Sequence, residues 1–320
     1  MSTLLSFVIP CYRSEKTIQP VIEEIIEIVS EKPNYDYEII CINDLSPDNV
    51  FLKLKGLSQD NPRIKVISLA KNMGKHSAIM AGYNYARGDY IVNLDDDFQC
   101  PMNEFWRLLH PLEKGKYDIS VAKYFGKKQS QWKKFGSYFN YVLSNAIFSK
   151  PKGLRIENFS VMKKFIMYEI IKYKNPYPSF EGLALRVTHN ITQVEMKHRT
   201  RADDNVNGFI LSKNISLLMS SLTSFSIKPL RVSIFLGVLF AFSGFIYGLY
   251  IIIKKIIIGP AMPTGFPSIL ASIVFSTGTI MILLGIIGEY IGRIYISLNA
   301  SPQFVVKETI NLETIKIVKK

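Results

Sequence analysis

The chain has 320 residues, 48% of them hydrophobic, and carries a formal net charge of +13. Its three cysteines, Cys11, Cys41 and Cys100, lie far apart, which excludes a disulfide-rich secreted domain and a cysteine-based metal site. The positive charge predicts an acidic partner: anionic lipid, a phosphorylated substrate or nucleic acid. No nucleic-acid motif accompanies the charge, so the first two partners are favoured.

Strands and helices alternate along the first two thirds of the chain. Apolar runs predict strands at residues 4–9, 37–42, 64–69, 90–94, 117–122 and 194–201. Apolar residues at helical spacing predict helices at residues 17–29, 51–57, 77–86, 103–112 and 137–148. This alternation predicts an α/β fold with a doubly wound, mostly parallel sheet.

Polar side chains follow the ends of four predicted strands. They are Tyr12, Asp44, Asn72 and Asp95. In doubly wound sheets, ligands bind beyond the carboxyl ends of the strands. The sequence therefore predicts one ligand site at this edge of the sheet.

Three successive carboxylates, Asp95, Asp96 and Asp97, follow the apolar run that ends at Leu94. They repel one another and lose hydration unless a cation neutralises them. If the strand geometry persists, Asp95, Asp97 and Gln99 point to the same side and can share one metal. Hard oxygen ligands favour Mg²⁺ or Mn²⁺. A solvated acidic turn is the alternative interpretation.

Four motifs, in this order and spacing, resemble those of family 2 (GT-A fold) inverting glycosyltransferases. They are Val8-Ile9-Pro10-Cys11-Tyr12, Asn43-Asp44-Leu45-Ser46-Pro47-Asp48, Asn72-Met73-Gly74-Lys75 and Asp95-Asp96-Asp97-Phe98-Gln99. The resemblance implies a Rossmann-like GT-A fold and a nucleotide-sugar donor. It also implies a metal held against the donor diphosphate by Asp95, Asp97 and Gln99, with Asp95 and Asp97 as the catalytic pair. The donor pocket that it implies is formed by Pro10, Tyr12, Glu15, Asp44, Asn72 and Asp96.

A basic, aromatic-rich segment at residues 123–134 is either a solvated loop or a contact with lipid head groups or a phosphorylated acceptor. Residues 155–162 resemble the segment in which polyprenyl-phosphate sugar transferases carry a Phe-Arg pair, with Ser160 in the Arg position. Lys123 stands where these relatives usually have Arg. The resemblance implies that Lys123, Arg199 and Arg201 bind the acceptor phosphate.

Two long apolar runs in the last third of the chain predict a transmembrane hairpin. Residues 232–253 form an uncharged run of about 33 Å as a helix, enough for a hydrocarbon core of about 30 Å. Residues 266–288 form the second run, and residues 211–229 are expected to lie along the membrane interface or to pack on the first domain. Basic residues outside the hairpin favour cytoplasmic termini. Residues 289–295 and 302–304 resemble the membrane-exit signature of bacterial polyprenyl-phosphate glycosyltransferases, and together with residues 229–231 they extend the resemblance over nearly the whole chain.

The predicted organisation is a GT-A catalytic domain at 1–210, an interfacial helix at 211–229, a two-helix membrane segment at 230–297 and a cytoplasmic tail at 298–320. The predicted function is transfer of a sugar from a nucleotide to a polyprenyl phosphate at the cytoplasmic leaflet of the inner membrane, for cell-envelope glycans. The acceptor phosphate is its own nucleophile in this interpretation, because it is largely dianionic at neutral pH.

Two alternatives remain open. A glycosyltransferase acting on a saccharide or protein hydroxyl requires a general base, for which Asp203, Asp204 and Glu157 are candidates. A non-catalytic membrane adaptor is the second alternative, against which the intact Asp95, Asp97 and Gln99 argue. A homo-oligomer is compatible with either.

Overall fold

The computed structural model describes residues 2–125, 154, 156–197, 199, 265–299 and 301–312, with scattered positions between 235 and 257. The chain divides into two compact units. Unit 1 comprises Met1–Ile210 with Ser301–Lys320, and unit 2 comprises Leu211–Ala300. The predicted helix at 137–148, the predicted interfacial helix at 211–229 and most of the basic segment at 123–134 lie outside the described residues.

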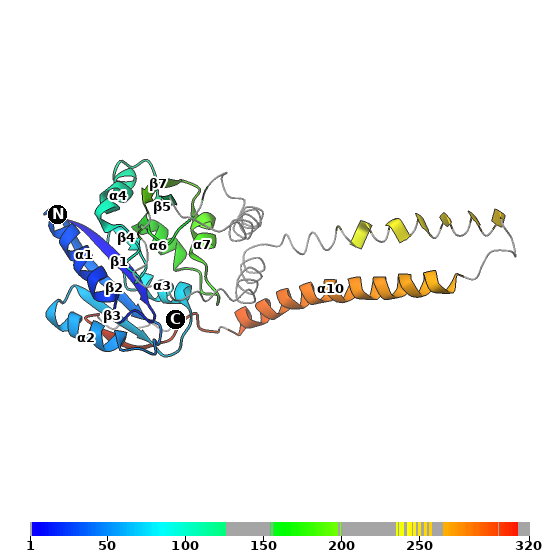
Figure 1. Ribbon diagram of the computed structural model, residues 1–320, viewed down its shortest axis with the longest axis horizontal. Helices are drawn as coiled ribbons and strands as arrows, with labels where there is room; N and C mark the ends of the chain where they lie inside the picture. The colour runs from blue at the N-terminus through cyan, green and yellow to red at the C-terminus, as the bar shows by residue number, and fades with distance from the viewer. Residues whose placement is uncertain are drawn as a thin grey trace. The chain divides into compact units, whose positions relative to one another are not determined.

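In the described part of unit 1, eight strands form one mixed sheet in the order β7-β5-β6-β4-β1-β2-β3-β8 (Figure 1). Strands β1 to β4 are parallel to one another, whereas β6 and β8 run antiparallel to their neighbours. This confirms the predicted α/β class with a mostly parallel sheet. The strands are β1 (Thr3–Cys11), β2 (Tyr35–Asn43), β3 (Ile64–Leu69), β4 (Tyr90–Asn93), β5 (Ile119–Phe125), β6 (Ser160–Lys163), β7 (Ile191–Lys197) and β8 (Val306–Ile310).

Helices cover both faces of this sheet. Successive residues of a strand point to opposite faces, and Leu5, Phe7 and Ile9 of β1 share one buried cluster with side chains of α1, α2 and α4. Helix α3 packs on the opposite face, against β1 and β2. The helices described in unit 1 are α1 (Ile18–Ser30), α2 (Val50–Asp60), α3 (Lys75–Tyr83), the short 3₁₀ helix η1 (Met102–Glu104), α4 (Phe105–Glu113), α6 (Lys164–Ile170) and α7 (Phe180–Val187).

Helix α3 approaches the sheet closely because residue 82 is a glycine. A Cβ atom at Gly82 would lie 2.5 Å from Val8 Cγ1 and 2.8 Å from Ile42 Cδ1. The close packing places α3 directly beside β1 and β2. The first residue of α3, Lys75, follows the loop at the end of β3, so this packing fixes the predicted motif at 72–75 at the ligand edge of the sheet.

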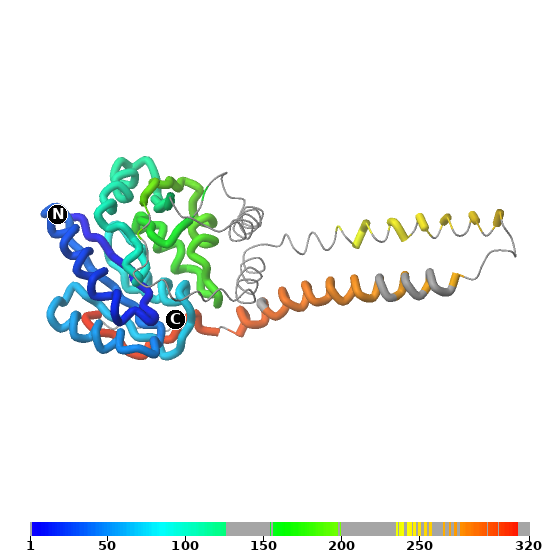
Figure 2. Tube along the Cα trace, viewed as in Figure 1, coloured from blue at the N-terminus to red at the C-terminus, as the bar shows by residue number. Residues whose placement is uncertain are grey.

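The end of the chain returns to the sheet as β8, which the sequence did not predict. β8 pairs antiparallel with β3, and Figure 2 shows this last segment in red beside it. Asn311, at a positive φ of 57°, donates from its side chain to the carbonyls of Ser58 (2.6 Å) and Ile64 (2.9 Å). These contacts fasten the end of β8 to the residues that precede β3.

In unit 2, helix α10 (Phe266–Leu298) contains the second predicted apolar run. Its segment Ser276–Leu298 is long and apolar enough to cross a membrane, with a mean hydropathy of 1.6, and is the one such helix found in the part of the chain that the structure describes. Large apolar side chains such as Ile280, Met281 and Ile282 are exposed on successive positions of this helix. Apolar side chains all round a helix are typical of a membrane span or of a helix in the core of a large protein. The first predicted run, 232–253, lies mostly outside the described residues.

Candidate functional site

The strand register brings the predicted ligand loops together. β1 lies between β4 and β2, with Cys11 opposite Asn43 and Val8 opposite Asn93. The segments that follow β1, β2 and β4 therefore leave the sheet at the same edge. Tyr12, Asp44 and Asp95 begin or lie within these segments, so the expected convergence of polar side chains is present.

Hydrogen bonds connect the loop after β1 to the loop after β2. The N–H of Arg13, which has a positive φ of 58°, donates to Ser46 Oγ at 2.7 Å. The N–H of Glu15 donates to Asp48 at 2.9 Å, and the carboxylate of Glu15 accepts from the N–H of Asn49 at 3.2 Å. These bonds hold Glu15 between the two loops.

Pro10 lies in β1, and Tyr12 is the first residue after that strand. Tyr12 is 43% exposed at the edge of the sheet, and the Arg13 guanidinium lies 5.5 Å from the centroid of its ring. Pro10 is buried within β1. An exposed aromatic ring at this edge provides a flat apolar surface on which a nucleotide base can stack.

Asp44 shapes the loop that precedes α3. Its buried carboxylate accepts hydrogen bonds from the N–H groups of Met73 (2.7 Å) and Gly74 (2.8 Å). Gly74 has a φ of 84°, which explains a glycine at this position. Burial raises the pKa of Asp44 above its ordinary value, and the two N–H donors act against that shift. The predicted donor contact of Asp44 stays a prediction, as does that of Asn72, which is exposed in the same loop.

Asp96 points back to the first loop. Its carboxylate accepts from the N–H of Tyr12 at 2.9 Å. Burial raises the pKa of Asp96 to about 6, the charges of Asp95 and Asp97 add to the rise, and the Tyr12 N–H opposes it. Asp96 therefore joins the β4 exit to the β1 exit, and its predicted role in donor binding remains untested.

Asp95 is held by two side chains that the sequence analysis did not assign to the site. The ammonium group of Lys75 forms an ion pair with Oδ1, and Asn158 Nδ2 donates to Oδ2 at 2.9 Å. Lys75 lay within the recognised motif at 72–75, so its charge was a usable signal. Asn158 lies far from Asp95 in sequence, within the segment 155–162 that resembles polyprenyl-phosphate sugar transferases, but that resemblance assigned no role to it.

The β4 strand does not continue into the acidic run. The prediction that strand alternation points Asp95, Asp97 and Gln99 to the same side is therefore wrong. β4 ends at Asn93, and Phe98 has a positive φ of 60°. The chain instead forms a tight turn in which the N–H of Gln99 donates to Asp97 Oδ1 at 3.2 Å. Asp97 and Gln99 are brought together by this turn.

The donor set of this turn fits a hard divalent cation. Asp95 and Asp97 supply carboxylate oxygens and Gln99 supplies an amide oxygen, which are the ligand types that Mg²⁺ and Mn²⁺ prefer. Within the described residues, no group of three or more acidic, histidine or cysteine side chains is placed to hold a metal. The agreement with a divalent cation therefore depends on the two carboxylates and the one amide alone. The Asp95 carboxylate is also paired with the ammonium group of Lys75.

The three cations predicted to bind the acceptor phosphate differ in their surroundings. Lys123 Nζ lies 2.7 Å from Glu195, and this pair is largely exposed. The guanidinium of Arg199 binds both carboxylate oxygens of Glu24, at 2.8 and 2.7 Å. Arg201 lies outside the described residues, as do Asp203 and Asp204. Ser160, in the position of the usual arginine, is fully buried in β6 and accepts from Asn93 Nδ2 at 3.1 Å.

Two family descriptions match the chain in succession. Residues 6–173 match "Glycosyl transferase family 2", and residues 228–294 match "GtrB C-terminal hairpin". The first match covers β2 to β6, most of β1 and the loops of the candidate donor site, and the second covers the region of both apolar runs. Together with the exposed apolar surface of α10, the hairpin match indicates membrane association.

Similar proteins extend over nearly the whole chain. The chain is 30% identical over 306 residues to the "Prophage bactoprenol glucosyl transferase homolog" of Escherichia coli (strain K12), covering 95% of this chain and 98% of that protein. It is 29% identical over 317 residues to the "Undecaprenyl-phosphate 4-deoxy-4-formamido-L-arabinose transferase" of Proteus mirabilis (strain HI4320), covering 97% and 94%. Glucosyl-3-phosphoglycerate synthase of Mycobacterium tuberculosis has a TM-score of 0.51 at 18% identity, over 70% of this chain and 81% of that one, a likeness of fold.

Proposed function

The chain belongs to glycosyl transferase family 2, and from this membership we propose that it transfers a sugar from a nucleotide-sugar donor to a polyprenyl phosphate. The observation that carries the proposal is the alignment over at least 95% of the chain with relatives named for bactoprenol or undecaprenyl phosphate. The relatives are named for different sugars, so the donor sugar is left to experiment. We place the reaction at the cytoplasmic leaflet of the inner membrane, with the chain crossing the membrane twice.

The donor is proposed to lie across the edge where β1, β2 and β4 end. Pro10, Tyr12 and Glu15 would line its base and ribose from the first loop. Asp44, Asn72 and Asp96 would complete the pocket from the neighbouring loops. The hydrogen bonds that the Asp44 carboxylate accepts from the N–H groups of Met73 and Gly74 support this assignment, because they fix the shape of the pocket before the donor arrives.

The departing diphosphate is the electrostatic problem of the reaction, because negative charge develops on it as the glycosidic bond breaks. We propose that Asp95, Asp97 and Gln99 hold a Mg²⁺ or Mn²⁺ ion, which supplies Lewis-acid stabilisation of that charge when bound. Asn158 orients the Asp95 carboxylate from one side. Lys75 places an ammonium group at the same carboxylate, where it supplements the positive charge that faces the diphosphate.

The acceptor phosphate needs no general base. A phosphate monoester has a second pKa of about 6 and is largely dianionic at neutral pH, so it attacks the sugar directly. Direct attack opposite the leaving diphosphate inverts the anomeric centre. Lys123 and Arg201 are the proposed acceptor contacts, and Lys123 would exchange Glu195 for the phosphate. For Arg199, an acceptor role requires release of Glu24.

The proposal is tested by incubating membranes that contain the full-length protein with a panel of radiolabelled nucleotide sugars. We expect one sugar to appear in an organic-soluble, acid-labile lipid product, to disappear on chelation of divalent ions, and to return with added Mg²⁺ or Mn²⁺. A product found only on soluble saccharide or on protein would contradict the lipid acceptor. Full activity under chelation would contradict the metal assignment and leave the acceptor assignment intact.

A further inference from the structure

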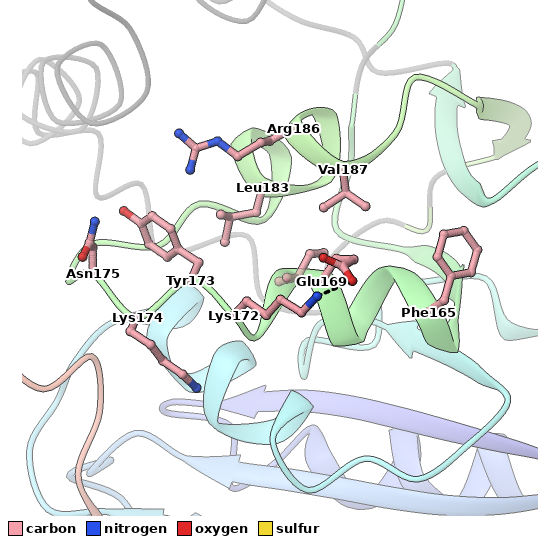
Figure 3. A pocket seen from close by; sticks show the side chains of 10 residues that line it. Phe165, Glu169, Lys172, Tyr173, Lys174, Asn175, Leu183, Arg186 and Val187 are labelled. Carbon is pink, nitrogen blue, oxygen red and sulfur yellow. Dashed lines mark hydrogen bonds and ion pairs between the residues drawn. The ribbon is translucent and has the colours of Figure 1, made fainter. Parts of the chain in front are cut away.

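The ion pair between Lys75 and Asp95 differs from an ordinary surface pair of this protein. Lys172 and Glu169, which line a hollow between α6 and α7, pair at 2.5 Å and have side-chain exposures of 69% and 47% (Figure 3). Exposed pairs of this kind contribute little to stability. Lys75 and Asp95 are instead 36% and 24% exposed, and they join the first residue of α3 to the loop after β4. Because the Asp95 carboxylate is also a proposed metal ligand, its pairing with a lysine affects metal binding.

Both oxygens of the Asp95 carboxylate are engaged. The ammonium group of Lys75 pairs with Oδ1, and Asn158 Nδ2 donates to Oδ2 at 2.9 Å. A divalent cation held by Asp95 would have to share this carboxylate with the ammonium group, and two cations at one carboxylate repel each other. Lys75 therefore competes with a metal ion for Asp95 until a further anion arrives to compensate the added charge.

The backbone of Lys75 is fixed, whereas its ammonium group can move. The preceding residue, Gly74, has a φ of 84°, and its N–H donates to Asp44 at 2.8 Å. Lys75 is the first residue of α3, so its main chain is held by this loop on one side and by the helix on the other. Its side chain is a flexible carbon chain that ends in a compact point charge. The ammonium group can therefore leave Asp95 for a neighbouring anion without a change in the main chain.

We propose that Lys75 occupies the Asp95 carboxylate in the absence of donor and transfers its ammonium group to the donor diphosphate when a nucleotide sugar binds together with the metal. A diphosphate has enough negative charge to pair with an ammonium group and a divalent cation at once. Lys75 then opposes the binding of metal alone and favours the binding of metal with donor. This inference rests on the proposed function, and it adds that metal and donor bind cooperatively through one lysine.

The test consists of two titrations of the purified full-length protein in neutral detergent. The first measures the affinity for Mn²⁺ alone by electron paramagnetic resonance. The second measures the affinity for UDP, GDP, CDP, ADP and dTDP by calorimetry at saturating Mn²⁺. The test variant is Lys75→Gln, which removes the charge, and Lys75→Arg conserves it. The matched control is Lys71→Gln, which removes an exposed lysine from the loop that precedes α3.

The two titrations should change in opposite directions in Lys75→Gln. We expect Mn²⁺ alone to bind roughly fivefold more tightly, on the scale of one partly exposed ion pair, because the competing charge is gone. The nucleoside diphosphate that wild type prefers should bind about ten- to a hundredfold more weakly, because one charged hydrogen bond is lost. Lys75→Arg should keep the wild-type affinity for Mn²⁺ alone, and Lys71→Gln should resemble wild type in both titrations.

An unchanged or weaker affinity of Lys75→Gln for Mn²⁺ alone would overturn the proposal, because Lys75 would then not compete with the metal. An equal tightening in Lys71→Gln would mean an effect of net charge, which also overturns it. Tighter Mn²⁺ binding with unchanged nucleotide affinity would overturn the transfer of the ammonium group to the diphosphate. If wild type binds none of these nucleotides, the proposed function fails and the transfer with it, whereas the titration with Mn²⁺ alone still decides whether Lys75 competes at Asp95.

Discussion

At the scale of single residues, the candidate site depends on the turn at residues 95–99, which follows β4 and is not part of the strand. Phe98 has a positive φ, an uncommon conformation for a large side chain, and it separates the proposed ligands Asp97 and Gln99. The guanidinium of Arg199 lies 5.2 Å from the Phe98 ring centroid and also donates to Asn103 at 3.2 Å. Side chains from outside the turn therefore hold it in place.

The charge of Asp97 is central to the proposed metal site. Asp97→Asn keeps the shape of the side chain and removes one anionic ligand. We expect kcat to fall by about a hundred- to a thousandfold, the loss typical when one group that stabilises transition-state charge is removed. Transfer is measured in purified protein over a range of Mn²⁺ concentrations, with Asp60→Asn at the exposed end of α2 as the matched control. Wild-type rates with wild-type metal dependence would remove Asp97 from the site.

Arg199 offers a test that separates two roles. The pair with Glu24 is partly buried, with side-chain exposures of 31% and 16%. If Arg199 positions the turn, both Arg199→Gln and Glu24→Gln should weaken Mn²⁺ binding by roughly fivefold, corresponding to about 1 kcal/mol for such a pair. Mn²⁺ affinity is measured by electron paramagnetic resonance without substrate. If Arg199 binds the acceptor instead, Arg199→Gln alone raises the KM for polyprenyl phosphate and Glu24→Gln leaves metal affinity unchanged.

Asp44 predicts a pH dependence of donor binding. Burial raises its pKa, so its carboxylate takes up a proton at a higher pH than an ordinary aspartate does. The protonated form loses acceptor capacity for the Met73 and Gly74 N–H groups that shape the donor loop. Affinity for a nucleotide sugar should therefore fall as the pH drops through this raised pKa. Calorimetric titrations should show the fall in wild type, whereas Asp44→Asn should bind weakly and keep only the part of the pH dependence that comes from Asp96, whose pKa burial raises to about 6. A pH dependence in Asp44→Asn as large as that of wild type would contradict the assignment.

At the scale of elements, the sequence predicted the helices and strands that have a clear periodicity of apolar residues or a long apolar run. The strands before Tyr12, Asp44, Asn72 and Asp95 were found because each is a short buried run followed by turn-forming residues. The family motifs lie at those strand ends, so the edge that forms the site was predictable too. Lys75 and Asn158 lie within the recognised segments at 72–75 and 155–162, but their contacts with Asp95 could not be predicted, because side-chain pairing across the fold leaves no local pattern.

Short elements stabilised by distant partners escaped prediction. β6 has four residues and pairs with both β4 and β5, and β8 has five residues, of which only Val306 and Ile310 are apolar. Neither forms a run that stands out from its surroundings. β8 exists because β3 presents an unpaired edge, which a returning strand satisfies with main-chain hydrogen bonds.

Asn311 provides the test of how β8 is held. Asn311→Ala removes two hydrogen bonds and places a Cβ-bearing residue without a polar side chain at positive φ. We expect a loss of about 2–3 kcal/mol in the free energy of unfolding. Asn311→Gly keeps the backbone conformation and should lose about 1–2 kcal/mol, the hydrogen-bond share alone. Thermal melts of the full chain in detergent measure both, and equal stability of all three proteins would mean that β8 does not depend on this anchor.

At the scale of the whole molecule, one chain joins a family 2 glycosyltransferase domain to a hairpin region. The first unit includes residues from both ends of the sequence, because Ser301–Lys320 belongs with Met1–Ile210. A chain that leaves this unit and returns to it must have both ends of the intervening segment on one side of any membrane it crosses. Two crossings satisfy this requirement, and one crossing does not.

This connectivity leads to a topology prediction. The nucleotide-sugar donor is cytosolic in the proposed reaction, so both termini should face the cytoplasm and the linker at 254–265 should face the opposite side. Basic residues flanking the hairpin favour the same orientation. The three native cysteines, Cys11, Cys41 and Cys100, are buried, so a membrane-impermeant maleimide has little background to overcome. Applied to intact cells, it should modify a cysteine introduced at Thr264 and spare one introduced at Ser2, and both should react after the cells are opened.

Labelling of Ser2→Cys but not Thr264→Cys in intact cells would reverse the orientation and place the donor site away from a cytosolic nucleotide sugar. Labelling at neither position before opening, with full labelling afterwards, would place the linker inside the cell and remove the two-crossing arrangement while leaving family membership intact.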